Sequence, residues 1–380
     1  MLRTVSRVVV PGGIAIMLLL LTPLLAIGAH MHTHAQAASP ATVSVFATGL
    51  NNPRGLKFGP DGKLYVAEGG QGGSNSTVGQ CKQVPAPIGP YTGGFTARIS
   101  SINAAGVRTT VVDHLPSSQT NAASGSLVSG VADVAFIGNT LYAVLAGAGC
   151  SHGVPSKPNA LLRIDTGEHE AYYIANLSHF LKTHPVKNPN PADFEPDGTW
   201  YGMVAVGQSL YAVEPNHGEL DKITPQGDQD DLSDSTISRV VDISASQGHI
   251  VPTAVVFHNG NFYVGNLDTF PIQNDSIIMK ITPGGQISTL VTGLSTVLGV
   301  AFDHEGRLYI LENTTGNSFP TPNTGALLRL TASGTLQTLA SGLNLPTAMT
   351  FGPDGNLYVS TFGFGGGPGA GQIVRIHINQ

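Results

Sequence analysis

Five oxygen-bearing side chains lie where short apolar segments end, and their types suit a divalent cation. Four of them stand three residues after a tyrosine, and the fifth lies just beyond: Glu68, Glu214, Asn266, Glu312 and Asp268. Carboxylate and amide oxygens are the ligands that Ca²⁺ and other hard divalent ions prefer. These residues therefore predict a site for Ca²⁺ or another divalent cation. The alternative is a structural network in which the same side chains bind protein groups.

A second set of polar residues lies close to these acids in the sequence and could contact a ligand. Its candidate members are Arg54, Glu68, His217 and His249. Arg54 is the one cation at its repeat position, where the other units have Ala132, Gly202, Thr253, Leu298 and Thr347. In the alternative interpretation, Arg54 pairs with one or two of the acids and plugs a central channel. The sequence has no G-x-S-x-G elbow, HExxH, Cys-x-x-Cys or EF-hand loop, so no catalytic residue is assigned.

A sixfold repeat predicts the elements that position these residues. The aligned tyrosines are Tyr65, Tyr142, Tyr211, Tyr263, Tyr309 and Tyr358. The later spacings of 52, 46 and 49 residues match the period of about 40–50 residues typical of propeller blades. Each unit reads as four strands (a to d), with turns such as Gly-Pro-Asp-Gly between a and b. The sequence therefore predicts an all-β, six-bladed β-propeller with four-stranded blades.

The fourth strand of the last blade is missing from the C-terminal end of the chain. Residues 42–50, "TVSVFATGL", match the fourth strands "ISTLVTGL" and "LQTLASGL" of other units. We therefore expect this N-terminal strand to pair with "IVRIH" near the C-terminus and close the ring. Closure removes an exposed sheet edge. The domain boundaries that follow are a single propeller domain at residues 42–380.

Long connections are expected to gather on one face of this propeller. The b–c and d–a connections share a face, and the long ones are residues 69–94, 146–159, 116–129 and 178–199. Long loops on one rim of a rigid scaffold are the expected place for a binding site. Cys81 and Cys150 both lie in b–c loops of adjacent blades, and we predict a disulfide between them.

The first 37 residues have the pattern of a secretory signal peptide rather than of the fold. Arg3 and Arg7 precede an apolar run from residue 8 to 29, and Ala35-Gln36-Ala37 is a small-x-small site. We expect a secreted or extracytoplasmic protein, on the cell surface if the segment stays uncleaved as an anchor. Contact with a membrane is expected only through this segment.

The composition excludes nucleic acid as a partner. Charged residues are 11% of the chain, against about 25% in typical domains, and the net charge is −6. A mildly acidic surface has no electrostatic attraction for phosphate backbones. We expect a monomer that binds a small molecule or a protein, of unknown identity in either case.

In these residues the chain resembles the ScyD/ScyE family of exported, NHL-like propeller proteins. The segments that carry the resemblance are "NNPRGLKFGPDGKLYVAEGG", "CKQVPAPIGPYTGGFTARIS", "GAGCSHGVP" and "DGTWYGMVAV…LYAVEPNHGEL". The resemblance implies an exported propeller and does not settle a biochemical role. Our first hypothesis is a non-catalytic binding or scaffold protein of this type that uses the face with the long loops. The alternative is a divalent-metal-dependent lyase or lactonase at the channel mouth, because Glu68, Glu214, Asn266 and Glu312 loosely resemble the metal ligands of gluconolactonase-like propellers. Whether the protein is an enzyme stays open.

Overall fold

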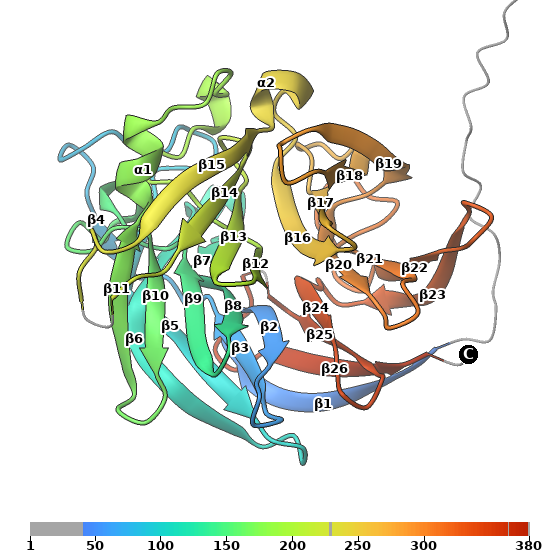
Figure 1. Ribbon diagram of the computed structural model, residues 1–380. Helices are drawn as coiled ribbons and strands as arrows, with labels where there is room; N and C mark the ends of the chain where they lie inside the picture. The colour runs from blue at the N-terminus through green and yellow to red at the C-terminus, as the bar shows by residue number, and fades with distance from the viewer. Residues whose placement is uncertain (1–40, 228–229, 364, 379–380) are drawn as a thin grey trace, which may run out of the picture. The chain divides into compact units, whose positions relative to one another are not determined.

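Six antiparallel sheets, one for each repeat, form the computed structural model, which describes residues 41–227, 230–363 and 365–378. The predicted six-bladed β-propeller is confirmed. Figure 1 shows the sheets following one another in chain order, with the N-terminal strand returning to the C-terminal one. The predicted signal peptide or anchor, residues 1–37, lies outside the described residues.

The blades are built as follows. Blade 1 contains β2 (Pro53–Phe58), β3 (Leu64–Glu68), β4 (Asn75–Ser76), β5 (Thr92–Ile102), β6 (Arg108–Gln119) and β7 (Val128–Ser129). Blade 2 contains β8 (Val131–Ile137), β9 (Thr140–Leu145), β10 (Ala160–Asp165) and β11 (Glu170–Asn176). Blade 3 contains β12 (Met203–Val206), β13 (Ser209–Glu214), β14 (Glu219–Thr224) and β15 (Thr236–Asp242).

The second half of the chain repeats this pattern. Blade 4 contains β16 (Pro252–His258), β17 (Asn261–Asn266), β18 (Ser276–Ile281) and β19 (Ile287–Leu294). Blade 5 contains β20 (Val297–Phe302), β21 (Leu308–Glu312), β22 (Gly325–Leu330) and β23 (Leu336–Leu343). Blade 6 contains β24 (Ala348–Phe351), β25 (Leu357–Thr361), β26 (Gly371–His377) and β1 (Thr42–Leu50).

The N-terminal strand closes the ring as the sequence predicts. Strand β1 pairs antiparallel with β26, from Thr42 opposite His377 to Leu50 opposite Gly371. Residues more than 300 positions apart in the chain thus share one sheet, and both ends of the described chain are fixed in blade 6. Figure 1 shows this pair as a blue strand beside a red one.

The aspartate in the recurrent turn between the first two strands of a blade accepts hydrogen bonds that hold the turn together. In blade 1, the Asp61 carboxylate accepts a hydrogen bond from the backbone N–H of Lys63 at 3.1 Å and from the Tyr65 hydroxyl at 3.1 Å. Asp354 and Tyr358 repeat this arrangement in blade 6, with a hydroxyl–carboxylate distance of 2.9 Å. The repeated motif is therefore a turn that holds the aligned tyrosine in place. Its role is structural, and it does not indicate a functional site.

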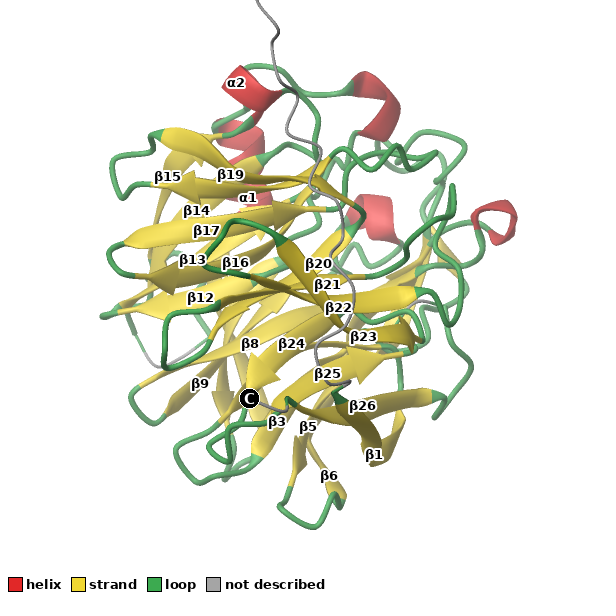
Figure 2. Ribbon diagram, turned by 90° about the vertical axis from the view of Figure 1, so that its right-hand side faces the viewer, coloured by secondary structure: helices red, strands yellow, loops and turns green. Residues whose placement is uncertain are grey.

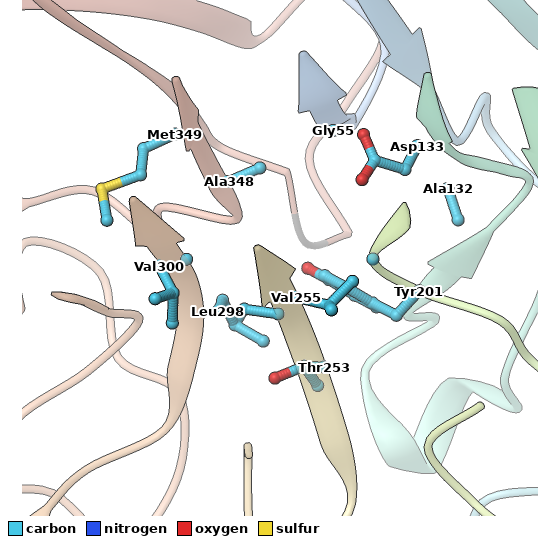
Figure 3. A pocket seen from close by; sticks show the side chains of 13 residues that line it. Gly55, Ala132, Asp133, Tyr201, Thr253, Val255, Leu298, Val300, Ala348 and Met349 are labelled. Carbon is cyan, nitrogen blue, oxygen red and sulfur yellow. The ribbon is translucent and has the colours of Figure 1, made fainter. Parts of the chain in front are cut away.

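The strands nearest the axis border a central channel. Figure 3 shows a pocket in this channel, with lining residues from the first strand of each of several blades. Strand b of each blade lies next outward and is almost completely buried, as in β3, β9 and β21.

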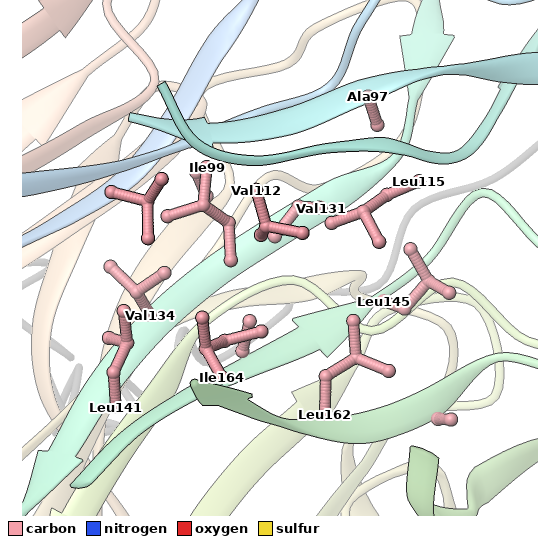
Figure 4. Close-up of a cluster of buried hydrophobic side chains, with 14 of the residues drawn as sticks. Ala97, Ile99, Val112, Leu115, Val131, Val134, Leu141, Leu145, Leu162 and Ile164 are labelled. Carbon is pink, nitrogen blue, oxygen red and sulfur yellow. The ribbon is translucent and has the colours of Figure 1, made fainter. Parts of the chain in front are cut away.

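Apolar clusters fill the spaces between neighbouring blades. One of them joins Ile99 and Val112 of blade 1 to Val134, Leu141 and Leu162 of blade 2 (Figure 4). Corresponding clusters lie between the other neighbours, including one that joins blade 6 to blade 1. Each fully buried leucine or isoleucine contributes about 1.5–3 kcal/mol, so the ring is held together by sheet-to-sheet packing.

The connections contain more regular structure than the sequence predicts. The predicted loops at residues 69–94 and 116–129 contribute β4 and β7, which makes blade 1 larger than four strands. Helix α1 (Leu177–Thr183) begins the predicted loop at residues 178–199, and α2 (Ser244–Gln247) follows β15. Figure 2 shows how few the helices are among the strands. Neither α-helix of the described chain has the length and apolar character to cross a bilayer.

Candidate functional site

The acids at the ends of the second strands bind backbone groups of their own blades. Glu68 accepts hydrogen bonds from the backbone N–H of Asn51 at 2.5 Å and from the hydroxyl of Ser100, and it forms an ion pair with Arg98 at 2.8 Å. Its side chain is 0% exposed. Glu312 accepts from the backbone N–H of Ser295 at 2.7 Å. These carboxylates tie the connection that enters a blade to the blade itself.

The Asn266 side chain also binds backbone groups, and Asp268 reaches the same connection through its backbone. The Asn266 amide donates to the carbonyl of Ile250 at 2.8 Å, and its oxygen accepts from the N–H of Ile277 at 2.7 Å. The backbone N–H of Asp268 donates to the same carbonyl of Ile250. Burial raises the pKa of the Asp268 carboxyl.

The proposed metal ligands therefore do not form a common coordination shell. Within the described residues, no group of three or more His, Cys, Asp or Glu side chains is arranged to hold a metal ion. We assign no chemical step to a metal ion. The contacts of Glu68, Glu214, Asn266 and Glu312 match the structural network that was the alternative.

Arg54 closes the channel with a tyrosine rather than with the predicted acids. Its guanidinium donates to the carbonyl of Val128 and, at 3.3 Å, to the hydroxyl of Tyr201. The Tyr201 hydroxyl donates in turn to the carbonyl of Thr347 at 3.1 Å. Blades 1, 3 and 6 thus meet across the axis, so the channel is plugged where its first strands begin. The sequence predicted a plug at Arg54 but not its partner.

A small pocket in the channel contains one carboxylate. Its volume is about 50 Å³ and its lining includes Gly55, Asp133, Tyr201 and Thr253, with apolar residues of blades 4, 5 and 6 (Figure 3). Ligand pockets for drug-sized molecules are about 300–1,000 Å³, whereas about 10–15 Å³ holds one water molecule. The pocket therefore has room for a few water molecules, not for a sugar ring.

Asp133 links two blades and has a perturbed proton affinity. Its carboxylate accepts from the backbone N–H groups of Val134 and Met203, each at 2.8 Å. Desolvation in the channel raises the pKa of Asp133 to about 7, although these two hydrogen bonds and the charge of Lys57 oppose the shift. A carboxyl group that titrates near neutrality can donate or accept a proton at physiological pH.

The long connections between strands are fastened to one another by a disulfide and by hydrogen bonds. The predicted disulfide between Cys81 and Cys150 is present and joins the b–c loops of blades 1 and 2. Asn121 donates to the carbonyls of Pro87, at 2.6 Å, and Gly89, at 2.8 Å. The Ser118 hydroxyl lies 2.9 Å from Nδ1 of His152. These contacts convert separate loops into one surface.

Residues 190–198, which we call the strap, run over this surface and contact three histidines. Asp193 lies 2.8 Å from Nε2 of His249. Phe194 packs against the ring of His217, and Glu195 lies 3.6 Å from Nε2 of His152. The three histidines belong to connections of blades 4, 3 and 2, so the strap spans that side of the face. The structure thus brings the predicted residues His217 and His249 to one segment, whereas Arg54 and Glu68 lie elsewhere.

Glu195 is the most strongly perturbed acid of the strap. The Tyr91 hydroxyl donates to its Oε1 at 2.5 Å, and its buried Oε2 has no hydrogen-bond partner in the part of the chain that the structure describes. Burial raises the pKa of Glu195 to about 8, and the nearby charges of Asp193, Glu214 and Asp197 add to the shift. Burial lowers the pKa of His152 to about 4, so this histidine is neutral at neutral pH.

Glu214 and His217 form a buried pair beside the strap. Nδ1 of His217 lies 3.1 Å from Oε2 of Glu214, whose Oε1 accepts from the N–H of Thr199 at 2.8 Å. Burial favours the neutral form of both groups, but their mutual attraction is stronger. The pKa of Glu214 is lowered as a result, and the pKa of His217 is raised. Lys82 lies over the Phe194 ring, 3.9 Å from its centroid.

Comparisons with known proteins agree with the fold. No family model matches the chain, and no curated protein does. A gluconolactonase of Xanthomonas campestris has a TM-score of 0.54 and 11% identity, over 91% of this chain and 93% of that one. A putative oxidoreductase (glucose dehydrogenase) of Thermus thermophilus has a TM-score of 0.53 and 17% identity, over 88% and 99%. At such identities the likeness defines the class as a β-propeller and nothing finer.

A third solved structure extends the same comparison. The PQQ-bound aldose sugar dehydrogenase of Streptomyces coelicolor has a TM-score of 0.50 and 14% identity, and the match covers 90% of this chain and 100% of that one. This chain is therefore similar in architecture to propellers of different chemistry.

Proposed function

We propose that this protein is an exported binding propeller of the ScyD/ScyE type that recognises its ligand on the long-loop face. One observation carries the proposal: four long connections are fastened into a single surface by a disulfide and by hydrogen bonds, most of them buried. A preorganised surface loses little conformational entropy when a ligand binds. The Arg54–Tyr201 plug supports this location, because the pocket beside it in the channel has room for a few water molecules only.

The proposed ligand class is a sugar or a sugar lactone. Three neighbours with a TM-score of 0.50 or more are described by names that refer to glucose, aldose sugars or gluconolactone. The polar groups of the strap surface, with carboxylates, imidazoles and a tyrosine hydroxyl, suit a ligand rich in hydroxyl groups.

The test is calorimetric titration of the protein, without residues 1–37, with D-glucose, D-gluconate and freshly dissolved D-glucono-1,5-lactone. Binding of at least one probe, with a matching rise in melting temperature, supports the proposal because a ligand that binds only the folded state stabilises it. Absence of binding to all three at millimolar concentration contradicts the sugar-ligand proposal.

Lactone hydrolysis is the second candidate, and Asp133 favours it. The pocket at Asp133 has no room for the lactone ring, so this reaction requires the Arg54–Tyr201 plug to open first. The Asp133 carboxyl, with a pKa of about 7, is then suited to general acid–base catalysis. The expected result is acid release from D-glucono-1,5-lactone above the spontaneous rate, measured by pH-stat with and without added Ca²⁺. An Asp133→Asn variant that hydrolyses the lactone as fast as the wild type contradicts a role for Asp133.

A further inference from the structure

The imidazole of His217 presents one nitrogen that nothing in the described part of the protein satisfies. The ring is 4% exposed, and its Nε2 is buried without a hydrogen-bond partner. The other nitrogen is already committed, because an ionised Glu214 can only accept and Nδ1 must donate to it. A buried polar atom without a partner costs about 1–3 kcal/mol, and a ligand that supplies a hydrogen bond to it recovers this cost.

The aromatic ring of Phe194 covers this imidazole. The two ring centroids are 4.9 Å apart, with an angle of 69° between the planes. The Lys82 ammonium lies on the phenyl ring at 3.9 Å from its centroid. A hydrocarbon ring thus contacts two groups, an imidazole and an ammonium, whose strongest partners would be oxygen atoms.

The ends of the strap are held more firmly than Phe194. On one side Asp193 contacts His249, and on the other side Asp197 accepts from the Ser151 N–H at 2.8 Å and binds Lys182 at 2.5 Å. Phe194 itself is half-buried. Its side chain can therefore leave while the rest of the strap stays in place.

We propose that Phe194 occupies a ligand subsite and that a six-membered ring bearing oxygen atoms replaces it. The incoming ring, a pyranose or a δ-lactone, has the size of the phenyl ring that leaves. Its oxygen atoms take hydrogen bonds from Lys82 Nζ and satisfy His217 Nε2, which can donate when protonated and accept from a hydroxyl when neutral. The inference rests on the proposed function. It adds the position of the subsite, the two side chains that recognise the ligand, Lys82 and His217, and the residue that competes with it, Phe194.

The first experiment measures affinity after removal of the competing ring. Phe194→Ala should bind D-glucose or D-glucono-1,5-lactone about tenfold more tightly than the wild type, because the apparent affinity rises with the fraction of open sites. Phe95→Ala, at another partly exposed phenylalanine, is the matched control and should leave affinity unchanged. In the Phe194→Ala background, His217→Asn should weaken binding about tenfold, which corresponds to about 1.4 kcal/mol.

These titrations separate failure of the inference from failure of the proposed function. If the wild type binds a probe but Phe194→Ala binds it equally well or less well, the subsite is wrong and the binding function stands. If neither protein binds any of the probes, the sugar-ligand function fails and the subsite fails with it.

The second experiment tests the geometry without a ligand. Diethyl pyrocarbonate modifies accessible neutral imidazoles, and peptide mapping reports each histidine separately. His114, 84% exposed, gives the reference rate in both proteins. Relative to His114, His217 should react slowly in the wild type and at least fivefold faster in Phe194→Ala, with protection by the sugar that binds. Equal rates for His217 in the two proteins would overturn the assignment of Phe194 as its cover.

Discussion

The structural assignment of Glu68 predicts a large and specific loss of stability in the variant Glu68→Ala. The substitution leaves the Arg98 guanidinium, which is 18% exposed, without its carboxylate at 2.8 Å. It also leaves the N–H of Asn51 and the hydroxyl of Ser100 without their acceptor. Removing one partner of a buried ion pair costs about 3–5 kcal/mol, because the other charge stays desolvated.

The expected shift in melting temperature follows from the size of the domain. At about 2.1 cal/mol/K per residue, roughly 340 residues give an unfolding entropy of about 0.7 kcal/mol/K. A loss of about 3–5 kcal/mol then lowers the melting temperature by about 4–7 °C, measured by differential scanning calorimetry. Glu68→Gln, which keeps an acceptor oxygen, should lose less than half as much.

A surface glutamate provides the control for this measurement. Glu305 is 50% exposed and lies 2.8 Å from Arg307. Exposed pairs contribute about 0–1 kcal/mol, so Glu305→Ala should shift the melting temperature by less than about 1.5 °C. If Glu68→Ala is no more destabilising than Glu305→Ala, and binding of Ca²⁺ or of a sugar is lost instead, the structural assignment of Glu68 is refuted.

Three further predictions concern a buried acid, the disulfide and the plug. Burial raises the pKa of Glu312 to about 7, above its ordinary value of 4.5, so this residue should make the wild type lose roughly 2–4 kcal/mol of stability as pH rises from about 5 to 7. In thermal scans across that range, Glu312→Gln should remove this share of the loss and leave the shares of Asp133 and Glu195, whose pKa values are also raised. The bridge between Cys81 and Cys150 closes a 69-residue separation, so its replacement by two serines should cost about 4 kcal/mol in denaturant titration, and equal midpoints for both proteins would contradict this. Tyr201→Phe removes the hydroxyl that links Arg54 to blade 6 and should cost about 1–2 kcal/mol by the same titration; a change below about 0.3 kcal/mol would show that the plug adds no stability.

The fold could be predicted from the sequence because its signals are local and repeated. The Gly-Pro-Asp-Gly turn and the tyrosine four residues after its aspartate are joined by a direct hydrogen bond, so both recur together. The ring closure was predictable because β1 resembles the outermost strands of other blades. The disulfide was predictable because the two cysteines fall in long loops of adjacent blades.

The site was harder to predict because residue type does not reveal which backbone group lies nearby. Glu68 and Glu312 have the chemistry of metal ligands, but the connection that enters each blade presents an N–H to them at 2.5 and 2.7 Å. Tyr201, the partner of Arg54, precedes the aligned segment of blade 3 and therefore escapes a comparison of repeats. Asp133 was visible as the one acid in the otherwise apolar segment "VADVAF", but an alignment based on the tyrosines gives this position no importance.

The strap residues escaped prediction for a different reason, and that reason bears on where function lies. Phe194 and Glu195 belong to a connection with no counterpart in the other blades, so no repeat identifies them. Two buried atoms at this connection, His217 Nε2 beside it and Glu195 Oε2 within it, have no hydrogen-bond partner among the described residues. Buried oxygens without a partner in the described chain also occur inside the repeats, at Glu219 and Asp221 of β14. The physical reason to look for a ligand at the strap is therefore the combination of such atoms with a half-buried ring, Phe194, that packs on one of them.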